Sequence, residues 1–185
     1  AFHPSPEKGP PFRSAVLVLL YPGNEGKELH IVLTVRSENV TVHKGQVSLP
    51  GGGCEPEDLT LLHTAIRETR EEIGIHGEDL RVLGALTPIY IEPSHFDVHP
   101  FVGYLPYQPY FSLETGEVAR IVEVPLKHFL DESCIAIEEW TVEGKLRQIP
   151  YFNVSGYKVW GATAIILAEF IAVLFSIETG LANSL

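Results

Sequence analysis

Residues 67–75 read R-E-T-R-E-E-I-G-I and place three glutamates, Glu68, Glu71 and Glu72, within five positions. On a helix, residues three and four apart share a face, with their Cβ atoms about 5–6 Å apart. Like charges at that spacing repel each other and lower the stability of the helix. A solvated charged face, in which Arg67 and Glu71 form an i,i+4 pair, is the simplest interpretation, and such a pair contributes roughly 0.2–0.5 kcal/mol.

The surrounding residues predict that this cluster lies on a helix. Asp58 can cap the beginning of the helix, and Gly74 is expected to end it. An apolar stripe with a spacing of three to four residues consists of Leu59, Leu62, Ala65, Ile66, Thr69 and Ile73. This phase turns Arg67 and the three glutamates away from the main core.

A glycine-rich break, P-G-G-G at residues 50–53, precedes the predicted helix. The break allows backbone carbonyl groups to come close to the carboxylates. Carboxylate and carbonyl oxygens are the ligands that Mg²⁺ and Mn²⁺ prefer. A divalent cation among the glutamates would replace their repulsion by coordination, and it would also bring a phosphorylated substrate to an acidic protein.

Strand patterns lie on both sides of the predicted helix. The expected strands cover residues 14–21, 30–36, 46–49, 80–91, 98–105 and 118–124, followed by a hairpin at residues 134–152 that turns near Gly144. A short helix is expected at residues 125–130 and a long apolar helix at residues 161–177. This order predicts an α/β (α+β) fold in which a mixed β-sheet is sandwiched between helices. Residues 1–12 are expected to form an extended N-terminal arm and residues 13–185 a single domain.

The predicted helix at residues 161–177 is apolar on nearly every side. The stretch is shorter than the roughly 20 apolar residues of a membrane-spanning helix, and Glu169 lies at its middle. We therefore expect a buried core helix and no association with membranes. A homodimer that packs through one apolar side of this helix is the alternative.

The formal net charge of the 185-residue chain is −11. This charge argues against nucleic-acid binding, which normally uses a basic face. The two cysteines, Cys54 and Cys134, form no CxxC pair, which argues against a disulfide scaffold and against a structural zinc site. Residues 183–185, N-S-L, do not match the peroxisomal signal S-K-L, and no targeting segment is visible near the N-terminus, so we expect a cytoplasmic protein.

Residues 52–75 resemble the Nudix box, G-x5-E-x7-R-E-U-x-E-E-x-G-U, in which U is an apolar residue. The matching residues are Arg67, Glu68, Glu71, Glu72, Gly74 and Ile75. Thr69 stands where an aliphatic residue is usual. The spacing from Gly52 to Arg67 is one residue longer than in the general pattern. The first glutamate of the box therefore has no strict equivalent, and Glu57 or Asp58 lies nearest to it.

Residues 33–52, L-T-V-R-S-E-N-V-T-V-H-K-G-Q-V-S-L-P-G-G, resemble the motif L-L-T-x-R-S-x3-R-x3-G-x-V-x-F-P-G-G of the coenzyme A diphosphatase branch of Nudix hydrolases. That branch has the same one-residue expansion before R-E. Thr41 replaces the family arginine, and Leu49 replaces the family phenylalanine. Residues 98–104, 117–126 and 159–164 are also similar to this branch, so the resemblance covers nearly all of the chain after the arm.

The resemblance implies a metal-dependent hydrolase that cleaves the diphosphate bond of coenzyme A or its thioesters. The products would be adenosine 3′,5′-bisphosphate (3′,5′-ADP) and 4′-phosphopantetheine. Glu68 and Glu72 would be the leading ligands of Mg²⁺ or Mn²⁺. Glu71 would be a further ligand or a base, and the carbonyl of Gly51 a backbone ligand. Arg67 would orient the glutamates through charge-assisted contacts.

The resemblance also implies a general base and a binding site for the substrate phosphate. A base in this family often comes from a distant loop, and Glu117 is our candidate, with Glu114 and Glu123 as competitors. The 3′-phosphate needs positive partners, for which the expected residues of the motif loop are Arg36, His43 and Lys44. Solvation of these three side chains in a surface loop is the alternative.

Two other functions stay open, as does a second metal site. A Nudix hydrolase could act on another nucleoside diphosphate derivative, such as ADP-ribose or a dinucleotide cofactor, and Thr41 keeps this alternative open. A non-catalytic nucleotide-binding module is the other alternative, although it would not need three mutually repelling glutamates. On an alternating strand, His95, Asp97 and His99 would share one face and supply three metal ligands; we expect a structural role for them rather than metal binding.

Overall fold

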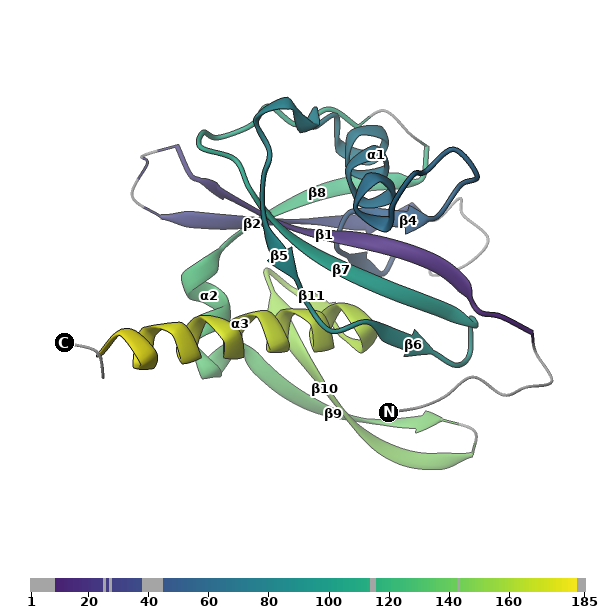
Figure 1. Cartoon of the computed structure of the whole chain (residues 1–185). Coiled ribbons are helices and arrows are strands. Elements are labelled where there is room, and N and C mark those ends of the chain that lie inside the picture. Colours follow the sequence, from purple (N-terminus) through teal and green to yellow (C-terminus); the bar gives the residue numbers. More distant parts are fainter. Residues whose placement is uncertain are drawn as a thin grey trace.

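The computed structural model describes residues 9–24, 26, 28–37, 45–113, 116–142 and 144–182. Its strands and helices follow the order expected from the sequence (Figure 1). They are β1 (Phe12–Pro22), β2 (Leu29–Arg36), β3 (Val47–Ser48), β4 (Gly51–Gly53), α1 (Leu61–Ile73), the 3₁₀ turn η2 (Gly77–Asp79), β5 (Arg81–Ala85), β6 (Ile89–Ile91), β7 (Phe96–Tyr104), β8 (Val118–Pro125), α2 (Leu126–Leu130), the 3₁₀ turn η3 (Glu132–Cys134), β9 (Ile135–Val142), β10 (Lys145–Val154), β11 (Tyr157–Val159) and α3 (Gly161–Ala182). Phe12, which was expected to end the N-terminal arm, instead begins β1.

β1 lies at the centre of the main sheet. The strand order is β3-β2-β1-β7-β5, while β8 also pairs with β2, β4 with β1, and β6 with β7. β1 and β7 run parallel, whereas β2 and β4 run antiparallel to β1, so the sheet is mixed. A central strand must be apolar on both faces, and the residues of β1 from Ala15 to Tyr21 are buried apart from the partly buried Val16.

The two faces of β1 pack against different helices. Leu17, Leu19 and Tyr21 belong to one core cluster, which includes α1, whereas Val18 and Leu20 belong to another, which includes α3. This separation follows from the alternation of side chains along a strand. Figure 1 shows α1 above the sheet and α3 below it. The predicted sandwich of a mixed sheet between helices is confirmed.

Helix α1 ends at Gly74, as predicted, because Gly74 takes the left-handed conformation (φ 74°) and donates its N–H to the carbonyl of Arg70. Its N-terminal cap, however, is Thr60, whose hydroxyl accepts the N–H of His63. The prediction that Asp58 caps the helix was wrong. Leu59, which was counted in the apolar stripe, lies before the helix and is exposed.

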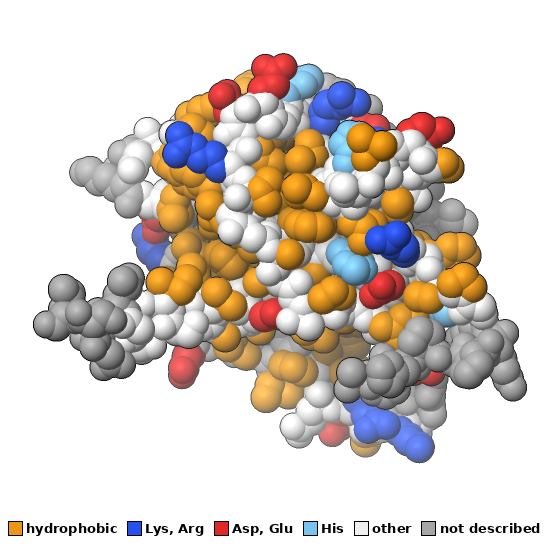
Figure 2. All heavy atoms as spheres, viewed as in Figure 1, with side chains coloured by type: hydrophobic (Ala, Val, Ile, Leu, Met, Phe, Trp, Pro, Cys, Tyr) orange, Lys and Arg blue, Asp and Glu red, His pale blue; other side chains and the backbone are white. Residues whose placement is uncertain are grey.

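Helix α3 is not the buried core helix that the sequence predicted. Ile166, Leu167 and Phe170 are buried against the sheet, but Ile165 and Phe175 are exposed. Figure 2 shows hydrophobic side chains spread over the face of the molecule that carries β5 and α3. The prediction failed because a helix that is apolar all round shows no preferred face in its sequence.

Helix α3 is 22 residues long and so extends beyond the predicted 161–177. By length and composition it could span a membrane, so the length argument against a spanning helix was wrong. Its central Glu169 accepts hydrogen bonds from the backbone N–H of Thr87 (3.0 Å) and from the Thr87 hydroxyl (2.7 Å). These bonds tie the helix to the segment between β5 and β6.

The predicted hairpin is formed by β9 and β10, and it extends below the main sheet (Figure 1). Together with β11 it makes a separate three-stranded sheet. The ring of Trp140 on β9 packs edge-on against that of Trp160, with 4.8 Å between the centroids. The hairpin therefore supports the residue that immediately precedes α3.

Candidate functional site

A cleft of about 970 Å³ lies between β4, α1, the segment joining β6 to β7, and the first turn of α3. The described charged residues that line it are Arg36, Glu55, Arg67, Glu68, Glu71, Glu72 and Glu117. Its apolar lining includes Ile91, Pro93, Trp160 and Ala162. Carboxylates outnumber guanidinium groups in this lining, so a diphosphate would be repelled unless cations accompanied it.

The glycine-rich segment forms the short strand β4 rather than the predicted break, because it pairs antiparallel with β1. Gly51 has φ 153°, and a Cβ there would lie 2.3 Å from the carbonyl oxygen of Ala15. A Cβ on Gly52 would lie 2.5 Å from a carboxylate oxygen of Glu68. The two glycines therefore let backbone and carboxylate come together, as the sequence indicated.

Arg67 is the centre of the hydrogen bonding in the cleft. Its Nε and Nη2 donate to the two carboxylate oxygens of Asp58 at 3.1 and 2.9 Å. Its Nη1 donates to Glu68 at 2.9 Å and to Glu71 at 3.2 Å, and Nη2 also donates to the carbonyl of Gly53 at 2.9 Å. The Asp58 side chain is almost inaccessible to solvent, and hydrogen bonding from Arg67 holds the pKa of Asp58 well below its usual range.

Sequence reasoning did not identify Asp58 as the partner of Arg67. The signal was present, since Asp58 lies next to the position of the first glutamate in the Nudix box. The carboxylate was instead interpreted as a helix cap, because Asp is common at that position. The forked guanidinium group of Arg67 can donate to both oxygens of one carboxylate, and this paired geometry explains why Asp58 binds Arg67 rather than the N-terminus of α1.

Glu72 is buried, with 5% of its surface exposed, although the helix phase predicted that it would point away from the core. Its Oε2 accepts the backbone N–H of Gly51 at 3.1 Å. Burial, with a further contribution from the charge of Glu68, raises the pKa of Glu72 to about 7 despite that hydrogen bond. Burial likewise raises the pKa of Glu68. The contact between Glu72 and Gly51 is made by the Gly51 amide N–H.

Arg36 and Glu117 also line the cleft, although 81 positions separate them in the sequence. Their side chains form an ion pair at 3.5 Å, in which Arg36 is mostly covered and Glu117 is 62% exposed. The Nε of Arg36 is buried and has no hydrogen-bond partner in the part of the chain that the structure describes. The fold therefore brings the candidate base and a candidate phosphate ligand into the cleft that holds the glutamates.

Other candidates lie elsewhere or outside the described residues. Glu123 accepts hydrogen bonds from the Tyr21 hydroxyl (3.0 Å) and from Gln108 (3.1 Å), and it is not part of the cleft lining. His43, Lys44, Glu114 and Thr41 are outside the described residues. Glu123 therefore has a structural hydrogen-bonding role rather than access to a substrate in the cleft.

The residues His95, Asp97 and His99 make local contacts. The Nδ1 of His95 is 2.8 Å from the Tyr90 hydroxyl, and the Nε2 of His99 is 3.0 Å from an Asp97 carboxylate oxygen. None of the three lines the cleft. These contacts fit the structural role that we expected for them.

The donor set of the cleft fits a hard divalent cation. Three glutamate carboxylates and the β4 backbone supply oxygen atoms. The raised pKa of Glu72 reflects its burial, which the Gly51 N–H and the charge of Arg36 offset only in part. Within the described ranges, no three His, Cys, Asp or Glu side chains converge into a preformed metal site. Glu68 and Glu71 point instead toward Arg67, so cation binding would require their carboxylates to turn.

Mg²⁺ is expected to raise the melting temperature, and by more at pH 8 than near pH 5.5. The pKa of Glu72 in the folded, metal-free protein is above its usual 4.5, at about 7, so the folded state binds this proton more tightly than the unfolded state. The metal-free protein therefore loses stability as the pH rises from about 4.5 to about 7. Only the ionised carboxylate coordinates a cation, so Mg²⁺ would offset this loss by mass action.

The measurement is a thermal melt at both pH values, with and without millimolar Mg²⁺ or Mn²⁺, and with NaCl of equal ionic strength as the control. A melting temperature that does not respond to either metal at pH 8 would contradict a cation site among the glutamates. An equal response to NaCl would show that the effect is general screening of charge.

Two curated relatives match most of this chain. Nudix hydrolase 15, mitochondrial, from Arabidopsis thaliana is 35% identical over 176 residues, which cover 92% of this chain and 61% of the relative. Mitochondrial coenzyme A diphosphatase NUDT8 from Homo sapiens is 37% identical over 140 residues, which cover 74% of this chain and 59% of the relative. The matched region thus spans about three fifths of the length of each relative.

The names of these relatives overturn one expectation from the sequence. Both proteins are named as mitochondrial, whereas we expected a cytoplasmic protein. That expectation rested on the failure to recognise a targeting signal in the residues at hand. An unrecognised signal carries no positive information about location, so the prediction of a cytoplasmic protein was wrong.

A solved structure and a protein-family model both match this chain. The MutT/nudix family protein from Enterococcus faecalis superposes with a TM-score of 0.59 at 16% identity, covering 93% of this chain and 65% of that protein. At this identity the likeness concerns the fold alone. The family model of the NUDIX domain matches residues 11–136, more than half of the chain. The chain, whose glutamate cluster first indicated this relationship, therefore belongs to the Nudix hydrolase family.

Proposed function

We propose that this protein hydrolyses the diphosphate bond of coenzyme A or its thioesters and releases 3′,5′-ADP and 4′-phosphopantetheine. The observation that carries the proposal is the cleft, which gathers the three glutamates, Arg36 and Glu117 around one space. The identity of 37% to a protein named as a coenzyme A diphosphatase supports the choice of substrate. The upstream motif at residues 33–52 supports the same choice.

Nudix hydrolases generally use divalent metal ions, and we expect Mg²⁺ or Mn²⁺ here. Glu68 and Glu72 would hold the cation, with Glu71 and the carbonyl of Gly51 as further oxygen ligands. When bound, the cation would neutralise charge on the phosphoryl oxygens and lower the pKa of a nearby water. The excess of carboxylates in the cleft would then attract the metal and its diphosphate together instead of repelling the substrate.

The side chains of the cleft would accept the proton of the attacking water and position the metal ligands. A carboxylate, Glu117 or Glu71, would accept a proton from the attacking water. The water oxygen would form a bond to one phosphorus while the bond from that phosphorus to the bridging oxygen breaks. Arg67, held by both oxygens of Asp58, would stay beside Glu68 and Glu71 and limit how far their carboxylates turn as they reach the cation.

Arg36 is the described residue that we assign to an anionic group of the substrate. Its unpartnered Nε can donate to a phosphate oxygen, and its contact with the exposed Glu117 is long enough to be exchanged for such a group. The exchange would also free the Glu117 carboxylate to act as a base. We expect His43 and Lys44, from the same motif, to contribute to this phosphate site.

Incubation with coenzyme A and, separately, with ADP-ribose tests the proposal directly. With Mg²⁺ or Mn²⁺ present, we expect release of 4′-phosphopantetheine from coenzyme A at a rate at least about tenfold above that of AMP from ADP-ribose, equivalent to about 1.4 kcal/mol of discrimination. Product identity is checked by mass spectrometry, and a reaction with EDTA serves as the metal-free control.

Two other outcomes would contradict the coenzyme A proposal. Faster cleavage of ADP-ribose would show that the protein acts on another nucleoside diphosphate derivative, and the coenzyme A proposal would fail. Binding of both compounds without cleavage of either would indicate a non-catalytic nucleotide-binding module.

A further inference from the structure

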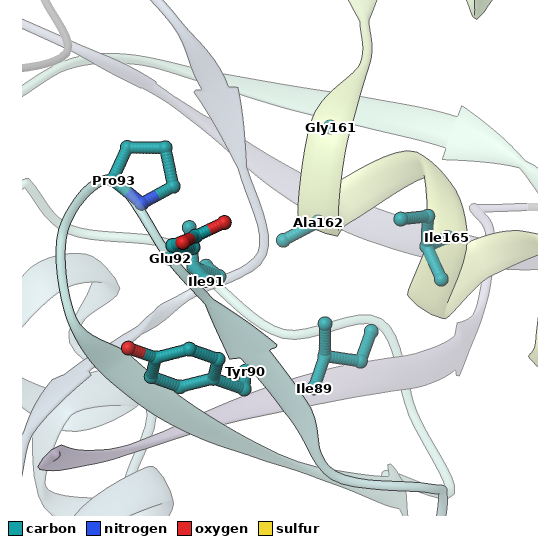
Figure 3. A pocket seen from close by; sticks show the side chains of 8 residues that line it. All are labelled: Ile89, Tyr90, Ile91, Glu92, Pro93, Gly161, Ala162 and Ile165. Carbon is teal, nitrogen blue, oxygen red and sulfur yellow. The ribbon is translucent and has the colours of Figure 1, made fainter. Parts of the chain in front are cut away.

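A second cavity, of about 270 Å³, lies between β6 and the first turn of α3 (Figure 3). We call it the side pocket, and its main lining residues are Ile89, Ile91, Pro93, Gly161, Ala162 and Ile165. Figure 3 shows the side chains of Ile89, Ala162 and Ile165 gathered between the strand and the helix. Ile89 and Ile91 share one face of β6 because side chains alternate along a strand.

The side pocket is continuous with the catalytic cleft. Ile91, Pro93, Gly161 and Ala162 line both spaces. Gly161 has φ 62°, and a Cβ built on it would meet no atom within 4 Å, so no other group covers this residue where the two spaces adjoin. A molecule whose diphosphate lies at the glutamates can therefore extend into the side pocket without leaving the protein surface.

The walls of the side pocket are held in place by long-range contacts. Thr87, two residues before β6, donates two hydrogen bonds to Glu169 of α3. Ile89 and Ile91 also pack against the core cluster that contains Ile166 of α3. β6 and α3 are thus tied to each other, so the side pocket between them is an open groove whose two sides are already in place before an occupant binds.

The chemistry of the lining decides what the side pocket can accept. Its described lining contains one carboxylate, Glu92, and no Lys, Arg or His. A phosphate or another anion would lack a positive partner there, and an uncharged polar group would find only Tyr90 and Glu92 as side-chain hydrogen-bonding partners among the described lining residues. An aliphatic chain, in contrast, gains free energy by leaving water for such a surface.

Resting on the proposed function, we propose that the side pocket binds the acyl chain of a coenzyme A thioester and so sets the preference of the enzyme for acyl-chain length. The diphosphate would lie at the glutamates, and the non-nucleotide half of the substrate would extend along the apolar wall of the cleft toward Gly161. Ile89 and Ile165 are then specificity-determining residues that take no part in the hydrolysis itself.

The test compares coenzyme A with its butyryl, hexanoyl and octanoyl thioesters. For the unmodified protein, kcat/KM is expected to rise with chain length, by up to about fourfold for each added methylene, which corresponds to about 0.8 kcal/mol. In Ile165→Gln, which introduces a polar group without changing the charge, the increase from butyryl to octanoyl should shrink to less than about twofold.

Ile177→Gln is the matched control. Ile165 and Ile177 lie on the same helix and are 56% and 54% exposed, but only Ile165 lines the side pocket. Ile177→Gln should keep the chain-length dependence of the unmodified protein. Equal dependence in Ile165→Gln, or no dependence in the unmodified protein, would overturn the proposal.

Binding without turnover separates this proposal from the proposed function. With Ca²⁺ in place of Mg²⁺, as another cation that binds carboxylate oxygens, and with product analysis to verify that no thioester is cleaved, the Kd of each thioester can be followed through tryptophan fluorescence, because Trp160 lies in the cleft next to Gly161. A Kd that falls with chain length and loses this dependence in Ile165→Gln supports the side pocket even if coenzyme A proves not to be cleaved. A chain-length-independent Kd, with coenzyme A cleaved normally, would refute the side pocket alone.

Discussion

Glu72→Gln is expected to reduce turnover of coenzyme A by more than about 100-fold. Replacing a residue that only orients a metal ligand typically costs roughly 10–100-fold, so a larger loss is expected for a ligand itself. Glutamine keeps the size of the side chain and can still accept the Gly51 N–H, but it removes the charge that would hold the cation. The metal-dependent rise in melting temperature should disappear with the activity. The measurements are steady-state kinetics with Mg²⁺ or Mn²⁺ and thermal melts with and without metal.

The same substitution should stabilise the metal-free protein at pH 8. The rise in the pKa of Glu72 from 4.5 to about 7 means that its ionised form destabilises the fold by on the order of 3 kcal/mol, at about 1.36 kcal/mol per pKa unit. A neutral amide removes most of this cost. Glu78→Gln, an exposed glutamate just beyond α1, is the control and should change neither activity nor stability. Normal turnover in Glu72→Gln would remove Glu72 from the site.

Arg67→Ala is expected to be the most destabilising of the substitutions considered. It would remove the two hydrogen bonds and the positive charge that Arg67 gives to the solvent-inaccessible carboxylate of Asp58, and it would leave Glu68 and Glu71 to repel each other. Breaking a buried pair typically costs 3–5 kcal/mol. Because this pair lies close to the surface of the cleft, we expect about 3 kcal/mol, a fall in melting temperature of roughly 6–12 °C.

Arg70→Ala is the matched control for this prediction, since Arg70 lies on the same helix and is exposed. Its effect should be less than about 0.5 kcal/mol, as for most surface substitutions. In Asp58→Asn the buried charge is absent, so adding Arg67→Ala to it should cost clearly less than Arg67→Ala alone. Strictly additive effects would show that Asp58 and Arg67 do not act as a pair. Arg67→Lys should recover part of the stability only, because an ammonium group cannot reach both oxygens in the same fork.

The local elements of this fold were predictable because each is marked by neighbouring residues. The alternation in β1 and the apolar spacing along α1 are periodic signals, and Gly74 marks the end of α1 through its left-handed conformation. That Glu68, Glu71 and Glu72 lie close together was predictable for the same reason, since all three lie within two turns of one helix. These signals require no knowledge of what packs against the element.

Two structural predictions were wrong at residues whose local sequence fits two different roles. Asp58 fits a helix cap as well as a guanidinium partner, and the choice depends on where Arg67 points. Gly51 fits a loop as well as an edge strand, and the choice depends on the approach of β1. In each case the deciding contact comes from residues that a local pattern does not include.

The sequence by itself determined the family and the sandwich of sheet and helices, and it pointed to the three glutamates as the candidate metal ligands, because these rest on short-range periodicity and on a contiguous motif. Only the tertiary structure decided that Glu72 is buried against Gly51, that Arg36 meets Glu117, and that α3 leaves one apolar side exposed beside the side pocket. Burial and ion pairing between distant residues depend on how strands and helices pack, and packing is a property of the whole chain.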